Sequence, residues 1–288
     1  MPPDIQYLTV RDFSLRLLAW PTAASTDFSG LTILLIHGFA DGADSWGPIA
    51  TALGAAGHRT IAPDLRGFGG SDRVGAGGYY HFPDYIGDLD GLLSQLPPGR
   101  FGLVGHSMGG TVATLLAGAR PDRFERVALL EGLGPPDNEH AHTPDRYARW
   151  LDDLRRPRAE RPMTPTEALD RLCLQHPSLP RPLLATKLPY LTREIAPGQL
   201  LWHFDPLHRT TAPVPFFAAN FAAFAGRIRC PVLLVHGGPE GFHPPDEAAR
   251  FAAFPDARVV EIEQGGHMMH WSRPEALSRA LVGFFGGG

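Results

Sequence analysis

The chain of 288 residues has few of the features that mark several protein classes. Its two cysteines, Cys173 and Cys230, match neither a metal-ligand spacing nor a disulfide framework, which favours a reducing compartment. No apolar run approaches the roughly 20 residues of a membrane helix, and the N-terminus shows no secretory signal. Lys and Arg (26) nearly balance Asp and Glu (30), without long runs of one sign. We therefore expect a cytoplasmic protein without membrane or nucleic-acid partners.

What the chain does contain is a series of short apolar runs that alternate with helical segments. The runs at Leu31–Ile36, Arg126–Leu130 and Pro231–His236 have strand length and no polar face, as expected when both faces of a sheet are covered. Strands that alternate with helices predict an α/β fold with a doubly wound, mostly parallel sheet. In such sheets the chemistry lies at the carboxyl ends of the strands.

The alternation stops between Glu131 and Cys230. Proline interrupts helical pieces there, such as Asp145–Arg155 and Thr166–Gln175. A linker between two domains is the alternative, but only two strands follow, too few for a second domain. We therefore predict a core formed by residues 1–134 and 216–288, and a helical cap formed by residues 135–215 that roofs a pocket.

The stretch Phe101–Thr114 organises the predicted site. Its sequence, FGLVGHSMGGTVAT, predicts a buried strand, a sharp turn at Ser107 and a helix. Gly105 and Gly109 flank the serine, where a side chain would collide with the neighbouring strand or helix. A bare G-x-S-x-G is a weak signal, but this one has the strand–turn–helix context that the motif requires. Ser107 is therefore the predicted nucleophile.

A serine hydroxyl needs a base within hydrogen-bond reach, and the base needs a group that holds its tautomer. His267 is the predicted base because it lies in a glycine-rich turn after the last strand; His270 is its rival. Two carboxylates follow strands and are candidates for the acid. We predict Glu131, whose apolar neighbours indicate an interior position, and keep Glu240, in a turn-like Gly-Pro-Glu-Gly, as the alternative.

An acyl-transfer intermediate also needs preorganised donors for its oxyanion. The backbone amide of Met108 follows the nucleophile, and the amide of Phe39 follows the strand Leu31–Ile36, where Gly38 permits close approach. These two amides are the predicted oxyanion hole. We expect the substrate pocket to be lined by His37, Gly38, Phe39, His106 and Trp202.

Four segments together resemble the α/β-hydrolase superfamily. They are HGF at 37–39, PDLRGFGGSD at 63–72, GHSMGG at 105–110 and GGHMMHWSRPE at 265–275. The resemblance implies that Ser107 is the nucleophile, His267 the base, Phe39 and Met108 the oxyanion amides, and residues 135–215 the cap.

The resemblance also bears on the acid. The common family pattern has aspartate at the place of Glu240, whereas some lineages place the acid after the strand that follows the nucleophile helix, which is where Glu131 lies. The sequence around Glu131 also resembles the group called serine hydrolase-like proteins. Dehalogenases and epoxide hydrolases of this fold use aspartate at the Ser107 position, so the serine excludes their ester intermediate.

Three functions remain open. The first is a serine esterase acting on a small, apolar substrate through an acyl-enzyme, without cofactor or metal, as a monomer or homodimer. The second is a carbon–carbon bond hydrolase of ring-cleavage products. The third is a non-catalytic receptor of the hydrolase fold, which would not need the serine, histidine and acid together. An arginine cluster in the predicted cap would attract an acidic substrate, but the acidic residues between the arginines favour a solvated face. The cluster consists of Arg155, Arg156, Arg158 and Arg161.

Overall fold

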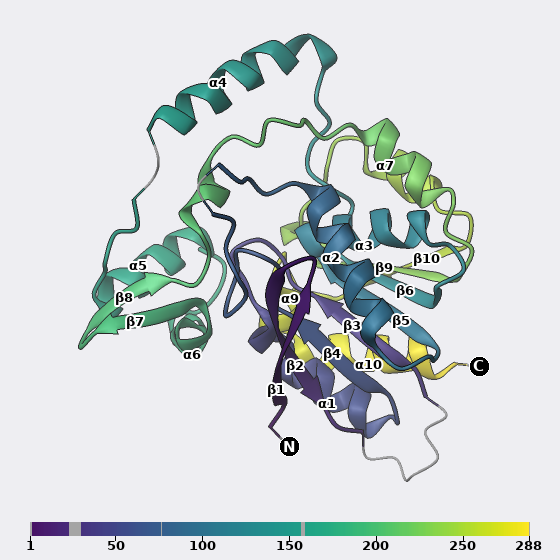
Figure 1. Cartoon of the computed structure of the whole chain (residues 1–288). Helices are drawn as coiled ribbons and strands as arrows, with labels where there is room; N and C mark the ends of the chain where they lie inside the picture. The colour runs from purple at the N-terminus through teal and green to yellow at the C-terminus, as the bar shows by residue number, and fades with distance from the viewer. Residues whose placement is uncertain (1, 23–29, 76, 157–158, 288) are drawn as a thin grey trace.

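The computed structural model describes residues 2–22, 30–75, 77–156 and 159–287. Within them an eight-stranded sheet has the order β1-β2-β4-β3-β5-β6-β9-β10 (Figure 1). The strands from β4 to β10 are parallel, whereas β2 pairs antiparallel with β1 and β4. This arrangement confirms the predicted fold class. The strands are β1 (Asp4–Val10), β2 (Phe13–Trp20), β3 (Thr32–Ile36), β4 (Arg59–Pro63), β5 (Phe101–His106), β6 (Phe124–Leu130), β9 (Val232–His236) and β10 (Ala257–Glu261).

Helices cover both faces of the sheet. On one face α1 (Gly47–Ala55) packs against α10 (Pro274–Gly286). On the other, α3 (Met108–Ala119) packs against both α2 (Phe82–Gln95) and α7 (Ala218–Ala225). Successive residues of a strand point to opposite faces, so one strand contributes to two cores. In β3, Ile33 and Leu35 join the core beneath α1 and α10, while Leu34 and Ile36 join the core beneath α2 and α3.

Short helices follow several strands at the carboxyl edge of the sheet. The loop after β3 ends in the 3-10 helix η1 (Ala43–Trp46), and the loop after β9 contains η4 (Gly238–Glu240) and α8 (Glu247–Ala252). After β10 comes α9 (Met269–Ser272), directly before α10. These loops carry Phe39, Glu240 and His267 of the predicted site.

The chain between β6 and α7 forms a separate lobe, seen beside the sheet in Figure 1, with α4 standing apart from it. The lobe has a small core that includes Leu172 and Leu184, and Trp271 of α9 packs into it from outside the lobe. It is not purely helical as predicted, because β7 and β8 pair as an antiparallel hairpin. Its elements are η2 (His140–His142), α4 (Thr143–Arg155), α5 (Pro165–Gln175), α6 (Arg181–Leu191), β7 (Thr192–Ala196), β8 (Gln199–Trp202) and η3 (Pro206–Arg209).

None of the helices in the described part of the chain combines the length and the apolar composition that a bilayer crossing requires.

Candidate active site

Ser107 occupies the tight turn between β5 and α3. Its backbone is strained, with φ 51° and ψ −118°, and its amide donates a hydrogen bond of 2.9 Å to the carbonyl of Leu130. A Cβ added at Gly105 would lie 2.4 Å from the carbonyl oxygen of Gly109, and one at Gly109 would lie 2.4 Å from that of Ile36. The missing side chains therefore let strand, turn and helix pack closely enough to raise the serine above the sheet edge.

The imidazole of His267 lies against the serine. Its Nε2 is 3.0 Å from Ser107 Oγ, in position to accept the hydroxyl proton. The residue belongs to the segment 264–268, here called the histidine loop, which joins β10 to α9. This loop is tied to the core by the amide of Gly266, which donates to the carbonyl of Gly237 at 2.9 Å. The His267 side chain keeps 35% of its surface exposed, so the base faces the solvent side of the site.

Glu131 is the carboxylate that faces the far side of this imidazole. It follows β6 directly, with φ 49°, and its carboxylate is buried. Oε2 lies 3.6 Å from His267 Nδ1, longer than a hydrogen bond but within ion-pair range. The backbone amide of Gly237 donates to Oε1 at 2.6 Å, and the amide of Phe242 donates to Oε2. Both carboxylate oxygens therefore accept hydrogen bonds from backbone amides, which hold the carboxylate in place beside the imidazole.

Glu240, the alternative acid, has a different environment. It ends η4 on an exposed surface, and within the described residues its carboxylate makes no hydrogen bond or ion pair. The geometry therefore brings Glu131, and not Glu240, to the imidazole.

The two predicted oxyanion amides come from segments that flank the serine. Neither the amide of Phe39 nor that of Met108 donates to an acceptor within the described residues, so both are free to bind an anion. The loop 37–42, here called the oxyanion loop, lies close to the nucleophile. A Cβ built on Gly38 would be 3.2 Å from the Cβ of Ser107. Phe39 is 47% exposed, and its ring contacts the rings of Phe68 and Phe204.

Comparison with known proteins identifies the family to which this arrangement belongs. The family model of the α/β hydrolase fold matches residues 32–274, which include the oxyanion loop, the serine turn, Glu131 and the histidine loop. The chain belongs to the α/β-hydrolase fold family. It is therefore a hydrolase of this fold, as the serine turn and the mostly parallel sheet led us to expect.

Three relatives illustrate the range within this family. The 2-hydroxy-6-oxononadienedioate/2-hydroxy-6-oxononatrienedioate hydrolase of Cupriavidus pinatubonensis is 26% identical over 98% of this chain and 95% of its own length. A serine hydrolase-like protein of Danio rerio is 26% identical over 88% of this chain and 81% of its own. The solved thioesterase domain from the curacin biosynthetic pathway is 25% identical, with a TM-score of 0.82 over 98% of this chain and 99% of that chain.

Two histidines expected to line the substrate pocket of this α/β hydrolase are buried beneath it instead. His37 is fully buried; its Nδ1 donates to the carbonyl of Gly38 at 2.7 Å, and its Nε2 accepts the amide of Leu65 at 3.0 Å. His106 is buried as well, and its Nε2 donates to the carbonyl of His267 at 2.8 Å. Both predictions are corrected: the two side chains are buried, and their hydrogen bonds hold the two loops in place instead of facing a substrate.

Trp202 is also placed differently from expectation. It is half-buried at the end of β8, stacks on Phe204 with ring centroids 6.2 Å apart, and lines a cavity within the cap. Trp202 therefore contacts Phe204, and it is Phe204 that contacts Phe39.

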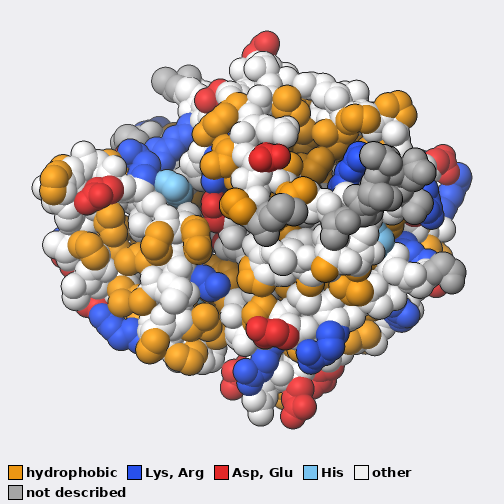
Figure 2. Space-filling model, turned by 90° about the horizontal axis from the view of Figure 1, so that it is seen from below, with side chains coloured by type: hydrophobic (Ala, Val, Ile, Leu, Met, Phe, Trp, Pro, Cys, Tyr) orange, Lys and Arg blue, Asp and Glu red, His pale blue; other side chains and the backbone are white. Residues whose placement is uncertain are grey.

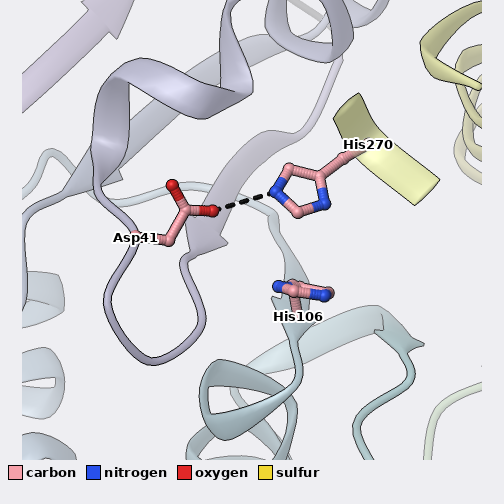
Figure 3. Close-up of side chains that lie close together, drawn as sticks. All are labelled: Asp41, His106 and His270. Atoms are coloured by element: carbon pink, nitrogen blue, oxygen red, sulfur yellow. Dashed lines mark hydrogen bonds and ion pairs between the residues drawn. The ribbon is translucent and has the colours of Figure 1, made fainter. Parts of the chain in front are cut away.

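A second histidine–carboxylate pair lies beneath the site, drawn in Figure 3. His270 Nε2 donates to Asp41 Oδ2 at 2.9 Å, and the hydroxyl of Ser45 and the amide of Gly42 donate to Asp41 Oδ1. Burial opposes the charged form of Asp41, but the hydrogen bond and charge of His270 and the Ser45 hydroxyl lower its pKa below the usual value. The pair joins the oxyanion loop to the short helix that follows the histidine loop.

His106 completes this buried cluster, with its ring 4.4 Å from that of His270. Burial lowers the pKa of His106 well below its ordinary value, and the nearby His270 and His267 lower it further, so the ring is neutral. Asp41, His106 and His270 could each offer one metal-ligand atom, all within 4.8 Å of one another. Asp41 and His270 bind each other directly, and His106 Nε2 is bound to a backbone carbonyl, so we interpret the cluster as a hydrogen-bonded pair with a neutral histidine beside it. Sequence reasoning noted His270 only as a rival base and found no signal for Asp41.

A cavity of about 420 Å³ opens beside the histidine loop. One wall is formed by residues 175–180, which comprise the last residue of α5 and its connection to α6, and His267 and Glu240 belong to the lining. Glu240 and His267 therefore line the same cavity, but no hydrogen bond or ion pair joins them within the described residues.

Proposed function

We propose that this hydrolase cleaves a carboxylic ester, or a related acyl bond, of a small and largely apolar substrate through an acyl-enzyme. The observation that carries the proposal is the 3.0 Å separation between Ser107 Oγ and His267 Nε2, with the buried Glu131 carboxylate on the other side of the imidazole. A strained serine, a base and a buried acid have little use in a protein that only binds a ligand.

The reaction follows from this geometry. His267 Nε2 takes the hydroxyl proton while Ser107 Oγ attacks the carbonyl carbon, and Glu131 stabilises the imidazolium that forms. The amides of Phe39 and Met108 bind the oxyanion. The intermediate collapses as the imidazolium gives its proton to the leaving alcohol. Water then attacks the acyl-enzyme with the same base, which releases the acid and restores the serine hydroxyl.

Fluorophosphonate labelling followed by peptide mass mapping tests the proposal. We expect an adduct on Ser107, and turnover of short p-nitrophenyl esters that Ser107→Ala abolishes. Ser94→Ala is a matched control, because Ser94 is an exposed serine on α2 that bonds only within its own helix. Labelling at another residue, or equal turnover by the Ser107→Ala variant, would contradict the proposed nucleophile.

The full-length likeness to the Cupriavidus pinatubonensis hydrolase favours a second candidate, hydrolysis of a carbon–carbon bond in a ring-cleavage product. The same serine and histidine serve either reaction, so the substrate must discriminate. A panel that compares p-nitrophenyl esters with a vinylogous diketone separates them: we expect higher kcat/KM for the esters, and preference for the diketone would establish the second candidate.

A further inference from the structure

The oxyanion loop makes a tight turn from Gly38 to Asp41. The amide of Asp41 closes the turn by donating to the carbonyl of Gly38 at 3.4 Å, and Phe39, whose amide is proposed to bind the oxyanion, lies inside it. Ala40 has φ 58°, a left-handed conformation that an alanine adopts only when the surrounding contacts hold it there. The direction of the Phe39 amide therefore depends on the groups that fix the two ends of the turn.

A side chain holds each end of this turn. At the first end, His37 Nδ1 donates to the carbonyl of Gly38 at 2.7 Å. At the second end, the Asp41 carboxylate accepts the hydroxyl of Ser45 and, at 2.9 Å, Nε2 of His270 (Figure 3). His37 and Ser45 are neighbours of the turn in the chain, whereas His270 lies 229 residues beyond Asp41. His270 therefore fixes the turn relative to another part of the site.

That part is the histidine loop. His270 lies on α9, three residues after the proposed base His267. The carbonyl of His267 accepts Nε2 of His106 at 2.8 Å, and His106 directly precedes Ser107. The serine turn, the histidine loop and the oxyanion loop are thus joined in series. His106 joins the first two, and the Asp41–His270 pair joins the last two.

The pair is shielded from water. Asp41 is 5% exposed and His270 is 1% exposed, and the His270 ring stacks on Trp46 with the ring centroids 5.3 Å apart. In keeping with this burial, little of the pale blue of histidine appears on the face of the molecule that Figure 2 shows. A hydrogen bond to a carboxylate is stronger in such surroundings than in water, and it holds both partners in one geometry.

We propose that Asp41 and His270 are positioning residues of the active site, whose hydrogen bond fixes the oxyanion loop relative to the histidine loop and holds the Phe39 amide where the oxyanion forms. The inference rests on the proposed function, because it concerns the same site. Both side chains are buried beneath the site and act through the loops that carry them. A displacement of about 1 Å in a catalytic group costs on the order of 10²-fold in rate, so the pair acts on kcat and not on substrate binding.

Two substitutions of His270 test the proposal by kinetics. Glutamine places an amide donor where the imidazole has Nε2, whereas asparagine is one methylene too short to reach Asp41. For p-nitrophenyl butyrate we expect His270→Asn to lower kcat by about 10²-fold with KM unchanged, and His270→Gln to stay within about fivefold of the wild type. His142→Asn, at an exposed position in η2, is the matched control. Equal kcat for the two His270 variants, or a loss confined to KM, would overturn the proposal.

Thermal melting separates positioning from a loss of stability. His270→Asn leaves the Asp41 carboxylate buried without this partner, so its folded fraction must be measured. Asp41→Asn/His270→Asn removes the buried charge and should melt at a higher temperature than His270→Asn, but with kcat equally low, because the two loops are still not joined. Recovery of kcat together with the melting temperature would show a purely structural role. If His270→Asn does not fold, the double variant is compared with His270→Gln in its place.

The rate of fluorophosphonate labelling distinguishes failure of this proposal from failure of the proposed function. The phosphonate oxygen occupies the oxyanion hole when Ser107 attacks phosphorus, so His270→Asn should slow labelling by about the same factor as kcat, and His270→Gln should label at nearly the wild-type rate. Slow labelling of His270→Asn without ester turnover by the wild type would refute the esterase but keep the positioning pair. Ester turnover by the wild type with equally fast labelling of both variants would refute the positioning pair alone.

Discussion

Replacing Glu131 by glutamine removes one charge while keeping the shape of the side chain. The carboxylate lies 3.6 Å from His267 Nδ1, and at an effective dielectric constant of about 20 this separation gives a charge interaction of about 4–5 kcal/mol with the imidazolium formed during reaction. Each tenfold change in rate corresponds to about 1.4 kcal/mol, so kcat should fall by about 10³-fold. KM should change little, because the imidazolium exists only after the proton has moved.

Glu131→Gln should also destabilise the fold. Two backbone amides, from Gly237 and Phe242, donate to the two carboxylate oxygens. A glutamine has only one side-chain oxygen, so its NH₂ group must face one of these donors, which costs about 1–3 kcal/mol of unfolding free energy. This loss is small enough for the variant to fold at room temperature in a domain of ordinary stability.

The assay is p-nitrophenyl ester hydrolysis at saturating substrate, with urea denaturation of each variant to establish that it is folded. Glu240→Gln is the matched control, and we expect its kcat to stay within about twofold of the wild type, since its exposed carboxylate has no partner in the described residues. A larger loss of kcat for Glu240→Gln, or a folded Glu131→Gln variant with nearly normal kcat, would show that Glu131 is not the acid.

Three further predictions concern stability. Burial lowers the pKa of His208 from 6.5 to about 3, so the unfolded chain binds a proton between pH 6.5 and 3 that the folded protein does not. The free energy of unfolding therefore falls as the pH drops through this range. His208→Asn should reduce this pH dependence by about 1.4 kcal/mol per pH unit, measured by urea titrations from pH 6.5 to 4. His270→Asn should cost about 2–4 kcal/mol by leaving the Asp41 carboxylate without its partner, and adding Asp41→Asn should cost less than the sum of the single changes. Gly105→Ala should lower the melting temperature and abolish activity, because its Cβ would lie 2.4 Å from a carbonyl oxygen, and normal activity would contradict the tight turn.

The regular elements of the core follow closely from local sequence. The predicted strands Leu31–Ile36 and Pro231–His236 are β3 and β9, each beginning one residue later than predicted. Apolar runs, glycine and proline predict such elements because each affects the conformation of the residues next to it in the chain. The β7–β8 hairpin in the cap was missed, since its two short strands are stabilised by pairing with each other and by tertiary packing, which a local pattern does not predict.

The sequence by itself determined the sheet, the turn that presents Ser107 and the glycine-rich segment that carries His267, because each depends on a short stretch of chain. Only the tertiary structure decided which glutamate meets the imidazole, since Glu131 and Glu240 both follow strands and differ in burial and direction, not in local pattern. The same holds for His37, His106 and the Asp41–His270 pair, whose partners lie on distant segments. Contacts between residues far apart in the chain depend on how the strands and loops pack, and no local motif encodes them.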